Sequence, residues 1–277
     1  IIHRKIAESS CFFAPILLQW RTMITEDSLI YLFHDVRRNY LVNVGQGTFH
    51  TDKGTMDLKG LIGKPWGTAV ETNLGVKYFA CKPTLHDLCM RVSRQTQIIY
   101  PKDGAQIMVK SGIGQGSRII ECGGGSGAMT TIMAHVIGPE GKVYVYERDE
   151  RFMKNALKNL TRYGLADRVE FKCREITPES EFEETGVDFC MLDSGSPWDL
   201  IPAAHKALKG GHRLATICPN AEQMNKFAVT LEEMNYVCIE CMELIVREWL
   251  ARKSKGTRPV QHMASHTGFL VFGTKTE

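Results

Sequence analysis

Short runs of alternating apolar and polar residues fill the chain between residues 28 and 83. The runs SLIYLFHD, NYLVNVG, TAVETN and KYFACKP are separated by Gly, Asn and Asp, which favour turns. A period of two is typical of strands that bury one face. The pattern therefore predicts a small antiparallel β domain in the N-terminal part of the chain.

Beyond about residue 95 the pattern changes to apolar strands that alternate with helices. Five apolar runs have the length of strands, at 117–122, 142–147, 169–173, 187–193 and 212–219. Helical patterns follow the first two runs, and a further helix is expected after Pro202. Such alternation indicates a parallel sheet with helices on both faces. The last two apolar runs, 236–246 and 268–274, have no helix between them, so we expect them to pair antiparallel.

A predicted helix over LHDLCMRV joins the two patterns. Thr84 precedes this helix and Asp87 occupies its third position, an arrangement similar to a capping box. We place the boundary near Arg94. This gives a small β domain with a linker helix over residues 25–94 and a larger α/β domain over residues 95–277.

Residues 1–24 are expected to be a leader or an extension of little functional weight. Their apolar run is interrupted by Pro15 and is too short to cross a bilayer, and no small-residue cleavage pattern follows it. The first methionine of the chain is Met23.

The net charge of the chain indicates no particular partner, whereas its cysteine content indicates a reducing compartment. The chain has 34 Lys and Arg against 31 Asp and Glu, and a formal charge of +3 is too small to indicate a nucleic-acid partner by itself. Its nine cysteines are an odd number, unlike the disulfide framework of a small secreted domain. We therefore expect reduced thiols and a cytoplasmic protein, or a nuclear or mitochondrial one in a eukaryote.

We expect no metal site. Cys238 and Cys241 form a C-x-x-C within a predicted strand, where positions three apart face opposite sides. His262 and His266 are four apart, but they lack the glutamate and the third ligand of known zinc patterns.

A glycine-rich turn, ECGGGSG, connects the first strand of the α/β domain to its helix. Glycines there allow a ligand close to the backbone, and the next helix offers free N–H groups. The second strand ends at Glu147, where a carboxylate can accept both hydroxyls of a ribose. A dinucleotide-dependent dehydrogenase would share both features, so the turn predicts a nucleotide-like cofactor without identifying it.

The residues of the turn and of the segment before it resemble known enzyme families more closely. E-x-G-x-G-S-G, with an acid ending the next strand, resembles the class I S-adenosylmethionine-dependent methyltransferases. The segment RQTQIIYPKDGAQIMVKSGIGQGSRIIECGGGSGAMT resembles the entry to the catalytic domain of the tRNA adenine-N1 methyltransferases that act on position 58. FHTDKGTMDLKGLIGKPWG and RPVQHMASHTGFLVFGTK resemble the same family, and the similarity covers residues 25–275.

This resemblance implies an α/β fold with a Rossmann-like class I methyltransferase sheet, mostly parallel with an antiparallel last strand, beside the small N-terminal β domain. It implies methyl transfer from S-adenosylmethionine to N1 of adenosine 58 in the tRNA T-loop, or of a neighbouring adenosine. The residues expected to bind or line the cofactor site are Gln97, Tyr100, Glu121, Gly123, Gly125, Ser126, Gly127, Glu147 and Glu175. The family usually has Asp at the position of Glu175.

Asp193 is the expected catalytic carboxylate, with Tyr100 as a second candidate. A carboxylate that is hydrogen-bonded to the adenine amine would stabilise the positive charge that methylation places on the ring. Asp193 could instead cap the turn before Pro197, and Tyr100 could close the core. DSGSPW departs from the family's D-x-P-x-P-W at Gly195, and its Trp198 is expected to pack rather than to stack on a base.

An RNA substrate requires a basic surface around the pocket. The candidates for RNA binding are Arg94, Lys102, Arg252, Lys253, Lys255, Arg258 and His266, with the run VREWLARKSKGTRP expected at the pocket rim. Such a run can also be only a solvated loop.

The family implies tRNA as the partner and a tetramer, either homomeric or formed with a related non-catalytic subunit. Two alternatives stay open: such a non-catalytic tRNA-binding subunit, and a methyltransferase of the same fold that acts on a protein carboxyl group.

Overall fold

The computed structural model describes residues 23–252 and 256–277. The chain divides into two compact units, one up to Asp87 and one over Leu88–Glu277, and each is described by itself. The boundary lies within helix α2 (Leu85–Met90). Within the described ranges, no helix is both long and apolar enough to cross a membrane.

The first unit is built from antiparallel strands. Its four-stranded sheet has the order β2 (Asn39–Asn43), β1 (Leu29–Phe33), β6 (Lys77–Cys81) and β5 (Ala69–Glu71), and β3 (Thr48–Thr51) pairs with β4 (Gly54–Asp57). Alternate residues of these strands, such as Ile30, Leu32, Tyr78 and Ala80, form the core. The predicted antiparallel β domain is therefore confirmed, because alternation places every second side chain in one apolar layer.

The predicted cap before α2 is also present. The backbone N–H of Thr84 donates to Oδ2 of Asp87 at 2.8 Å, and the N–H of Asp87 donates to Oγ1 of Thr84 at 3.2 Å. Each side chain satisfies a backbone donor that the first helical turn leaves unpaired.

The second unit contains a seven-stranded sheet. Its order is β12 (Val237–Glu243), β15 (Phe269–Thr274), β11 (Leu208–Cys218), β10 (Val187–Leu192), β7 (Arg118–Cys122), β8 (Lys142–Glu147) and β9 (Val169–Cys173). The strands from β11 to β9 are parallel to one another, and β15 is antiparallel to both of its neighbours. This confirms the predicted mostly parallel sheet with an antiparallel last strand.

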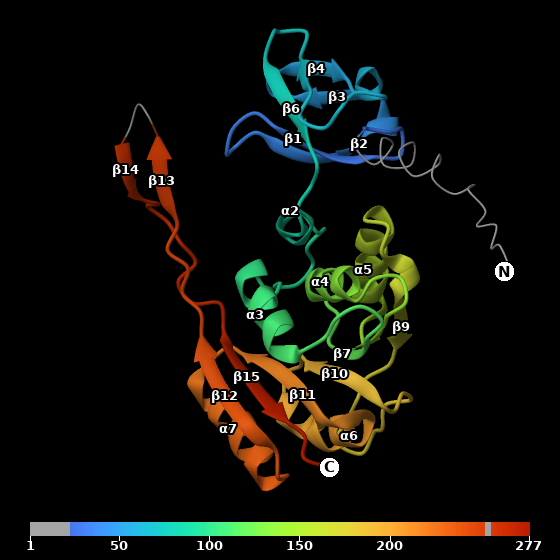
Figure 1. The fold of residues 1–277 in the computed structure, drawn as a ribbon, viewed down its shortest axis with the longest axis vertical. Helices are drawn as coiled ribbons and strands as arrows, with labels where there is room; N and C mark the ends of the chain where they lie inside the picture. Colours follow the sequence, from blue (N-terminus) through green and yellow to red (C-terminus); the bar gives the residue numbers. More distant parts are fainter. Residues whose placement is uncertain (1–22, 253–255) are drawn as a thin grey trace, which may run out of the picture. The chain divides into compact units, whose positions relative to one another are not determined.

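Helices cover both faces of this sheet, as a sheet of buried parallel strands requires. In Figure 1, α3 (Pro101–Ser111), α4 (Ala128–Ile137) and α5 (Glu150–Arg162) lie on one face, and α6 (Ile201–Ala207) and α7 (Ala221–Glu233) lie on the other. Neither α3 nor α7 is among the elements that the sequence pattern predicts. In α3, Gly104 packs so close to α4 that a Cβ there would lie 2.3 Å from Cδ1 of Ile132. Glycine is a poor helix former, but at this position it allows the two helices to pack closely.

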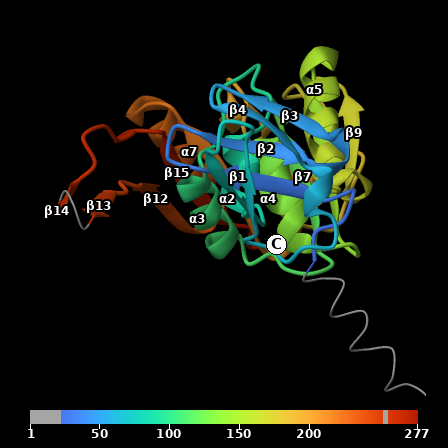
Figure 2. The same cartoon turned by 90° about the horizontal axis from the view of Figure 1, so that it is seen from above.

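A β-hairpin interrupts the chain between β12 and β15. Its strands, β13 (Trp249–Arg252) and β14 (Gly256–Pro259), pair antiparallel. Figures 1 and 2 both show this hairpin standing clear of the sheet and helices of its own unit. The hairpin contains the basic run that was expected near the pocket.

Candidate functional site

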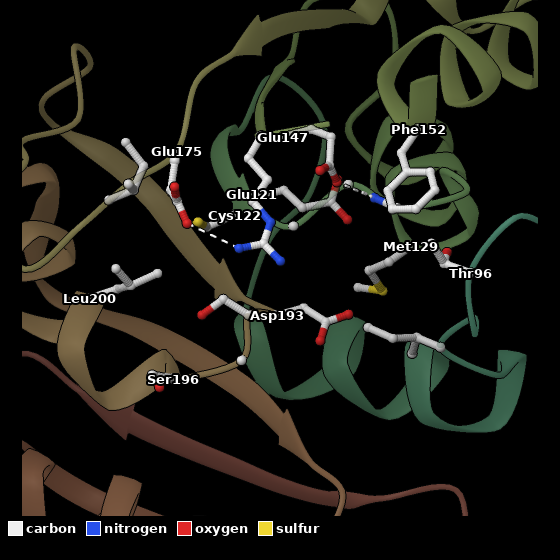
Figure 3. A pocket seen from close by; sticks show the side chains of 18 of the residues that line it. Thr96, Glu121, Cys122, Met129, Glu147, Phe152, Glu175, Asp193, Ser196 and Leu200 are labelled. Atoms are coloured by element: carbon white, nitrogen blue, oxygen red, sulfur yellow. Dashed lines mark hydrogen bonds and ion pairs between the residues drawn. The ribbon is translucent and has the colours of Figure 1, made fainter. Parts of the chain in front are cut away.

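A cavity of 630 Å³ lies in the second unit, where β7, β8 and β10 end at their carboxyl edges. It also borders the segment 96–99 ahead of α3 and the residues 174–178 that follow β9. In a sheet of parallel strands, ligands bind outside the carboxyl ends of the strands. Figure 3 shows Glu121, Glu147, Glu175 and Asp193 around this space, with Met129 and Phe152 at one side.

The glycine turn brings the ends of two strands into contact. Gly123 has a φ of 92°, and a Cβ at this position would lie 1.8 Å from the backbone oxygen of Asp193. The N–H of Asp193 donates to the carbonyl of Cys122 at 2.8 Å, which holds the two strand ends side by side. Only glycine combines this backbone angle with this close approach.

Ser126 anchors the segment that precedes α3. Its Oγ accepts hydrogen bonds from the N–H groups of Gln95 and Thr96 at 3.1 and 3.2 Å and lies 2.9 Å from Oγ1 of Thr96. With both lone pairs occupied, the Ser126 proton is directed at Thr96. The side chain is 2% exposed, so its hydroxyl is engaged by the protein, although the residue borders the cavity.

Glu147 is held at the end of β8 by backbone donors. Its Oε2 accepts from the N–H of Gly125 and its Oε1 from the N–H of Asp149, both at 2.9 Å. The carboxylate is buried and borders the cavity. Two backbone bonds fix its orientation before any ligand binds.

The cavity contains a cluster of carboxyl groups with raised pKa values. Burial raises the pKa of Glu121 to about 8, against the hydrogen bond that Oγ1 of Thr130 donates at 2.5 Å, and the nearby Asp193 and Glu147 add to the rise. Burial, followed by repulsion from Glu147, raises the pKa of Asp193 to about 7. A cationic ligand would stabilise the ionised forms of these carboxyl groups.

Glu175 and Arg148 form an ion pair on the wall of the cavity. Nη1 of Arg148 lies 3.1 Å from Oε1 of Glu175, the dashed contact of Glu175 in Figure 3, and both side chains are exposed. Apolar side chains complete the wall, namely Ile98, Ile99, Met129, Phe152, Ile176 and Leu200. The site therefore offers acidic and apolar surfaces in one space.

Most of the predicted cofactor residues meet at this cavity. Those that border it, with the predicted catalytic Asp193, are Gln97, Glu121, Gly123, Gly125, Ser126, Glu147, Glu175 and Asp193. Tyr100 and Gly127 are not among the residues that border it, so the predicted cofactor contact of Gly127 and the predicted role of Tyr100 stay predictions. Tyr100 directly precedes α3, and its carbonyl accepts the N–H groups of Asp103 and Gly104. Gly127 precedes α4, and a Cβ there would lie 3.0 Å from that of Ala156.

The predicted RNA-binding residues separate into two groups. Arg94, Arg252 and Arg258 are exposed, whereas Lys253 and Lys255 lie outside the described residues. None of the described hairpin residues borders the cavity, so the expectation that the basic run lies at its rim is wrong.

Lys102 and His266 make contacts within the protein. The Lys102 side chain is only 15% exposed and donates to three oxygen atoms, so its predicted place on an open basic surface is corrected. Nδ1 of His266 lies 2.7 Å from Oε1 of Glu243, and Nε2 lies 3.1 Å from the carbonyl oxygen of Pro219. Trp198 packs against the core, as predicted, and Nζ of Lys226 lies 4.2 Å from its ring centroid.

Thr96 and Arg148 are among the polar residues at the cavity that were not predicted from the sequence. Thr96 contacts Ser126 from a segment about thirty positions earlier, and no local pattern indicates that pairing. Arg148 could have been found, because it directly follows the strand-end acid Glu147 and therefore had to lie near the same edge.

Comparison with known proteins gives a consistent result. The family model described as tRNA methyltransferase complex GCD14 subunit matches residues 78–258. The tRNA (adenine(57)-N(1)/adenine(58)-N(1))-methyltransferase TrmI of Methanocaldococcus jannaschii is 31% identical, over 84% of this chain and 90% of the relative.

Two solved structures resemble almost the whole chain. A protein from Thermotoga maritima described as an S-adenosylmethionine-dependent O-methyltransferase is 36% identical, with a TM-score of 0.84 over 93% of this chain and 96% of its own. The tRNA (m1A58) methyltransferase TrmI of Aquifex aeolicus is 28% identical, with a TM-score of 0.78 over 92% and 99%. The chain therefore belongs to the TrmI family of tRNA (adenine-N1)-methyltransferases, which has the class I S-adenosylmethionine-dependent methyltransferase fold.

Proposed function

We propose that this protein transfers a methyl group from S-adenosylmethionine to N1 of adenine 58 in tRNA, with the neighbouring adenine 57 as a further target. The observation that carries this proposal is the carboxylate of Asp193, which borders the cavity beside a glycine turn that holds two strand ends together. Family membership supplies the substrate class.

The residues of the cavity fit S-adenosylmethionine. Gly123 and Gly125 let the turn pack closely against Asp193 and Thr96, which places the backbone of the turn at the edge of the cavity. The carboxylates of Glu121, Glu147 and Asp193 would balance the positive charges of the cofactor, which supplies the methyl group as a sulfonium. Glu147 would hold the ribose hydroxyls, and Glu175 the adenine amine. The apolar wall around Phe152 suits a nucleoside base.

Asp193 would act on the substrate base. Displacement of a methyl group requires the attacking nitrogen in line with the bond that breaks, so holding the two partners accounts for much of the catalysis. The Asp193 carboxylate would accept a hydrogen bond from the amine of the target adenine. As N1 becomes bonded to carbon, positive charge spreads onto that amine, and a fixed carboxylate in a dry site stabilises it.

The pH dependence should reveal this carboxylate. Because the pKa of Asp193 is raised to about 7, its ionised form is lost as the pH falls through 7, and kcat/KM should fall with it. The fall of kcat on the acid side of the pH profile, its acid limb, should lie at lower pH than the fall of kcat/KM. The reason is that the bound cationic cofactor lowers the pKa of a neighbouring carboxyl group. Glu121→Gln should leave the limb in place, because the pKa of Glu121 is raised to about 8, so Glu121 is mostly protonated where Asp193 titrates, and Glu147 is the negative neighbour of Asp193. A limb that vanishes in Glu121→Gln would assign it to Glu121 instead.

The activity itself can be measured directly. Purified protein is incubated with unmodified tRNA and labelled S-adenosylmethionine, and the modified nucleosides are mapped. We expect 1-methyladenosine at position 58. Its absence, with cofactor binding confirmed, would identify a non-catalytic tRNA-binding subunit. Label that a protein acceptor takes up and then releases as volatile methanol on alkaline hydrolysis would favour O-methyl transfer, the activity in the description of the Thermotoga maritima structure.

We also propose that the protein works as an oligomer, as a homotetramer or as a heterotetramer with a related subunit. Large apolar side chains are exposed on and beside the hairpin, with Ile245 64% and Trp249 60% exposed. Apolar side chains gathered at one surface favour burial against another chain. Light scattering on the purified protein should give a mass near four chains, and a monomer mass with full activity would contradict the proposal.

A further inference from the structure

A segment without regular secondary structure forms one wall of the cavity. Residues 174–186 form neither a helix nor a strand, and residues 174–178 border the cavity. We call 174–178 the wall segment. It contains Glu175, whose side chain faces the cavity in Figure 3. Because no strand ladder or helix fixes the wall segment, its position depends on the individual contacts that it and the residues after it make.

The chain turns after the wall segment and is bonded back to it. The N–H of Ser180 donates to the carbonyl of Thr177 at 3.0 Å, which closes the turn. Nη2 of Arg174 then donates to the carbonyl of Glu181 at 2.8 Å, across the turn. At the start of the segment, the N–H of Arg174 donates to the carbonyl of Glu147 at 3.0 Å. The wall segment is therefore tied both to the end of β8 and to the residues that follow the turn.

The residues after the turn are held by Tyr146 of β8. The Tyr146 hydroxyl donates to Oε2 of Glu184 at 2.7 Å and accepts the N–H of Glu183 at 2.9 Å. Its ring meets the ring of Phe182 edge-on, with centroids 5.0 Å apart. Lys172 of β9 pairs with the carboxylates of both Glu183 and Glu184. We call Tyr146, Lys172 and Glu184 the wall anchor.

The wall anchor is buried, so its polar groups depend on one another. Tyr146 is 1% exposed, Glu184 is 8% exposed, and the Lys172 side chain is 14% exposed. Burial, followed by the hydrogen bond to Glu184, raises the pKa of Tyr146 to about 12. The hydroxyl therefore keeps its proton and donates at neutral pH. Its loss would leave a buried carboxylate oxygen without this donor, which is costly.

Tyr146 also connects the wall anchor to the glycine turn and to Glu147. Its carbonyl accepts the N–H of Gly123 at 2.8 Å, and the next residue along β8 is Glu147, which borders the cavity. Ile176 of the wall segment belongs to the same core cluster as Tyr146 and Phe182. One residue thus relates the wall segment to the strand end that presents Glu147.

We propose that the wall anchor positions Glu175 for the adenine amine of S-adenosylmethionine. This inference rests on the proposed function, which gives the cavity this cofactor and gives Glu175 this contact. Tyr146, Lys172 and Glu184 are not among the residues that border the cavity, so they act through the wall segment. A misplaced Glu175 would bind the amine poorly, while the rest of the cofactor would keep its contacts. The wall anchor therefore governs selectivity for a base that carries an amine.

Tyr146→Phe is the direct test, because it removes the hydroxyl and keeps the ring. Two ligands are titrated by calorimetry: S-adenosylhomocysteine, and S-inosylhomocysteine, in which a carbonyl replaces the amine. The original protein should bind the first more tightly. In Tyr146→Phe, affinity for S-adenosylhomocysteine should fall about tenfold, the effect of one hydrogen bond to a charged group, and affinity for S-inosylhomocysteine by less than about twofold.

Turnover should divide in the same way. In Tyr146→Phe, KM for S-adenosylmethionine should rise about tenfold, whereas kcat at saturating cofactor and tRNA should stay within about twofold, because the lost contact is equal in ground and transition states. Equal losses of affinity for the two ligands would overturn the proposal, since they would show a general loosening of the site. A fall of kcat at constant KM would do the same.

Tyr163→Phe is the matched control. The Tyr163 hydroxyl donates to the carbonyl of Leu88 at 3.1 Å, and Tyr163 is not among the residues that border the cavity. This variant should bind both ligands as the original protein does. If it changes the ratio of the two affinities as much as Tyr146→Phe does, the wall anchor has no special role.

Glu184→Gln decides the question if Tyr146→Phe does not fold. It keeps an oxygen acceptor for the Tyr146 hydroxyl but removes the negative charge beside Lys172. The ratio of the two ligand affinities should narrow by about threefold. An unchanged ratio in this folded variant would contradict the proposal.

A double-mutant cycle links the wall anchor to Glu175 itself. In a Glu175→Ala background, Tyr146→Phe should lower affinity for S-adenosylhomocysteine by less than about twofold, because the contact that the anchor serves is already absent. A further loss of about tenfold there would show that Tyr146 acts through another residue, against the proposal.

The outcomes for the original protein separate this inference from the proposed function. Equal affinity for the two ligands would overturn the inference, because Glu175 would then not hold the amine. If the original protein prefers S-adenosylhomocysteine but forms no 1-methyladenosine, the proposed methyl transfer fails, and the ligand titrations still decide on the wall anchor. If the original protein is active and Tyr146→Phe keeps its ratio of affinities, only the wall anchor fails.

Discussion

Replacing Asp193 with Ala should reduce kcat by about 10²- to 10⁴-fold, the range for removing one group that stabilises charge or moves a proton in the transition state. Cofactor affinity should change by only a few-fold, because the Glu147 carboxylate, which two backbone N–H groups hold, still borders the cavity. Single-turnover assays with saturating S-adenosylmethionine and tRNA measure the first effect, and calorimetric titration of the cofactor measures the second.

Asp167→Ala is a suitable control for this experiment. Asp167 is an exposed aspartate that lies outside the cavity lining. It should leave both kcat and cofactor affinity unchanged. Turnover by Asp193→Ala at the rate of this control would remove Asp193 from the mechanism and leave it as a strand-end residue that holds the turn.

Gly123→Ala should abolish cofactor binding and lower the free energy of unfolding by about 3 kcal/mol. The new Cβ would lie 1.8 Å from the backbone oxygen of Asp193, and a backbone atom cannot swing aside as a flexible side chain can. The positive φ of this glycine adds strain. Because the clash pushes the ends of β7 and β10 apart, it also displaces Asp193.

Denaturant unfolding and calorimetric titration with S-adenosylmethionine measure these two losses. Gly114→Ala is the matched control, because a Cβ at that position meets no heavy atom within 4 Å and the backbone there is not left-handed. It should change stability by well under 1 kcal/mol. Gly123→Ala protein that binds the cofactor as tightly as this control would contradict the close approach seen at the strand ends.

The departure at DSGSPW can be interpreted in the same terms. Gly195 is exposed, and a Cβ there would meet no heavy atom within 4 Å. The position borders the cavity without supporting Asp193, which is held by Cys122 through the backbone. Replacing the family's usual proline by glycine therefore removes no contact that fixes the catalytic carboxylate among the described residues.

Several parts of the site followed from local sequence alone. The acids Glu121 and Glu147 stand at the ends of apolar runs, and Asp193 directly follows one. In a parallel sheet, such ends meet at one edge. Tight strand-to-helix turns with a left-handed residue require glycine, so the glycine-rich turn could also be predicted from the sequence. The motif TQIIYPKD then pointed to the family, although it did not reveal that a helix begins at Pro101.

Other parts depended on pairings between residues far apart in the chain. Lys102 contacts Thr267 across 165 positions, so a lysine that is exposed in most sequence contexts is buried here. The Ser126 hydroxyl accepts hydrogen bonds from the backbone N–H groups of Gln95 and Thr96. The raised pKa values of Glu121 and Asp193 require burial and mutual proximity, which no single segment encodes.

The sequence by itself determined the two strand patterns, the glycine turn and the edge at which the acids gather, because hydrophobic period, turn chemistry and strand direction are local properties. Only the tertiary structure decided which polar groups face the cavity and which hold the protein together. Tyr100, Lys102 and His266 have partners within the protein that no local pattern indicates. A buried polar group takes whichever partner the packing brings within hydrogen-bond distance, and that partner is set by the whole fold.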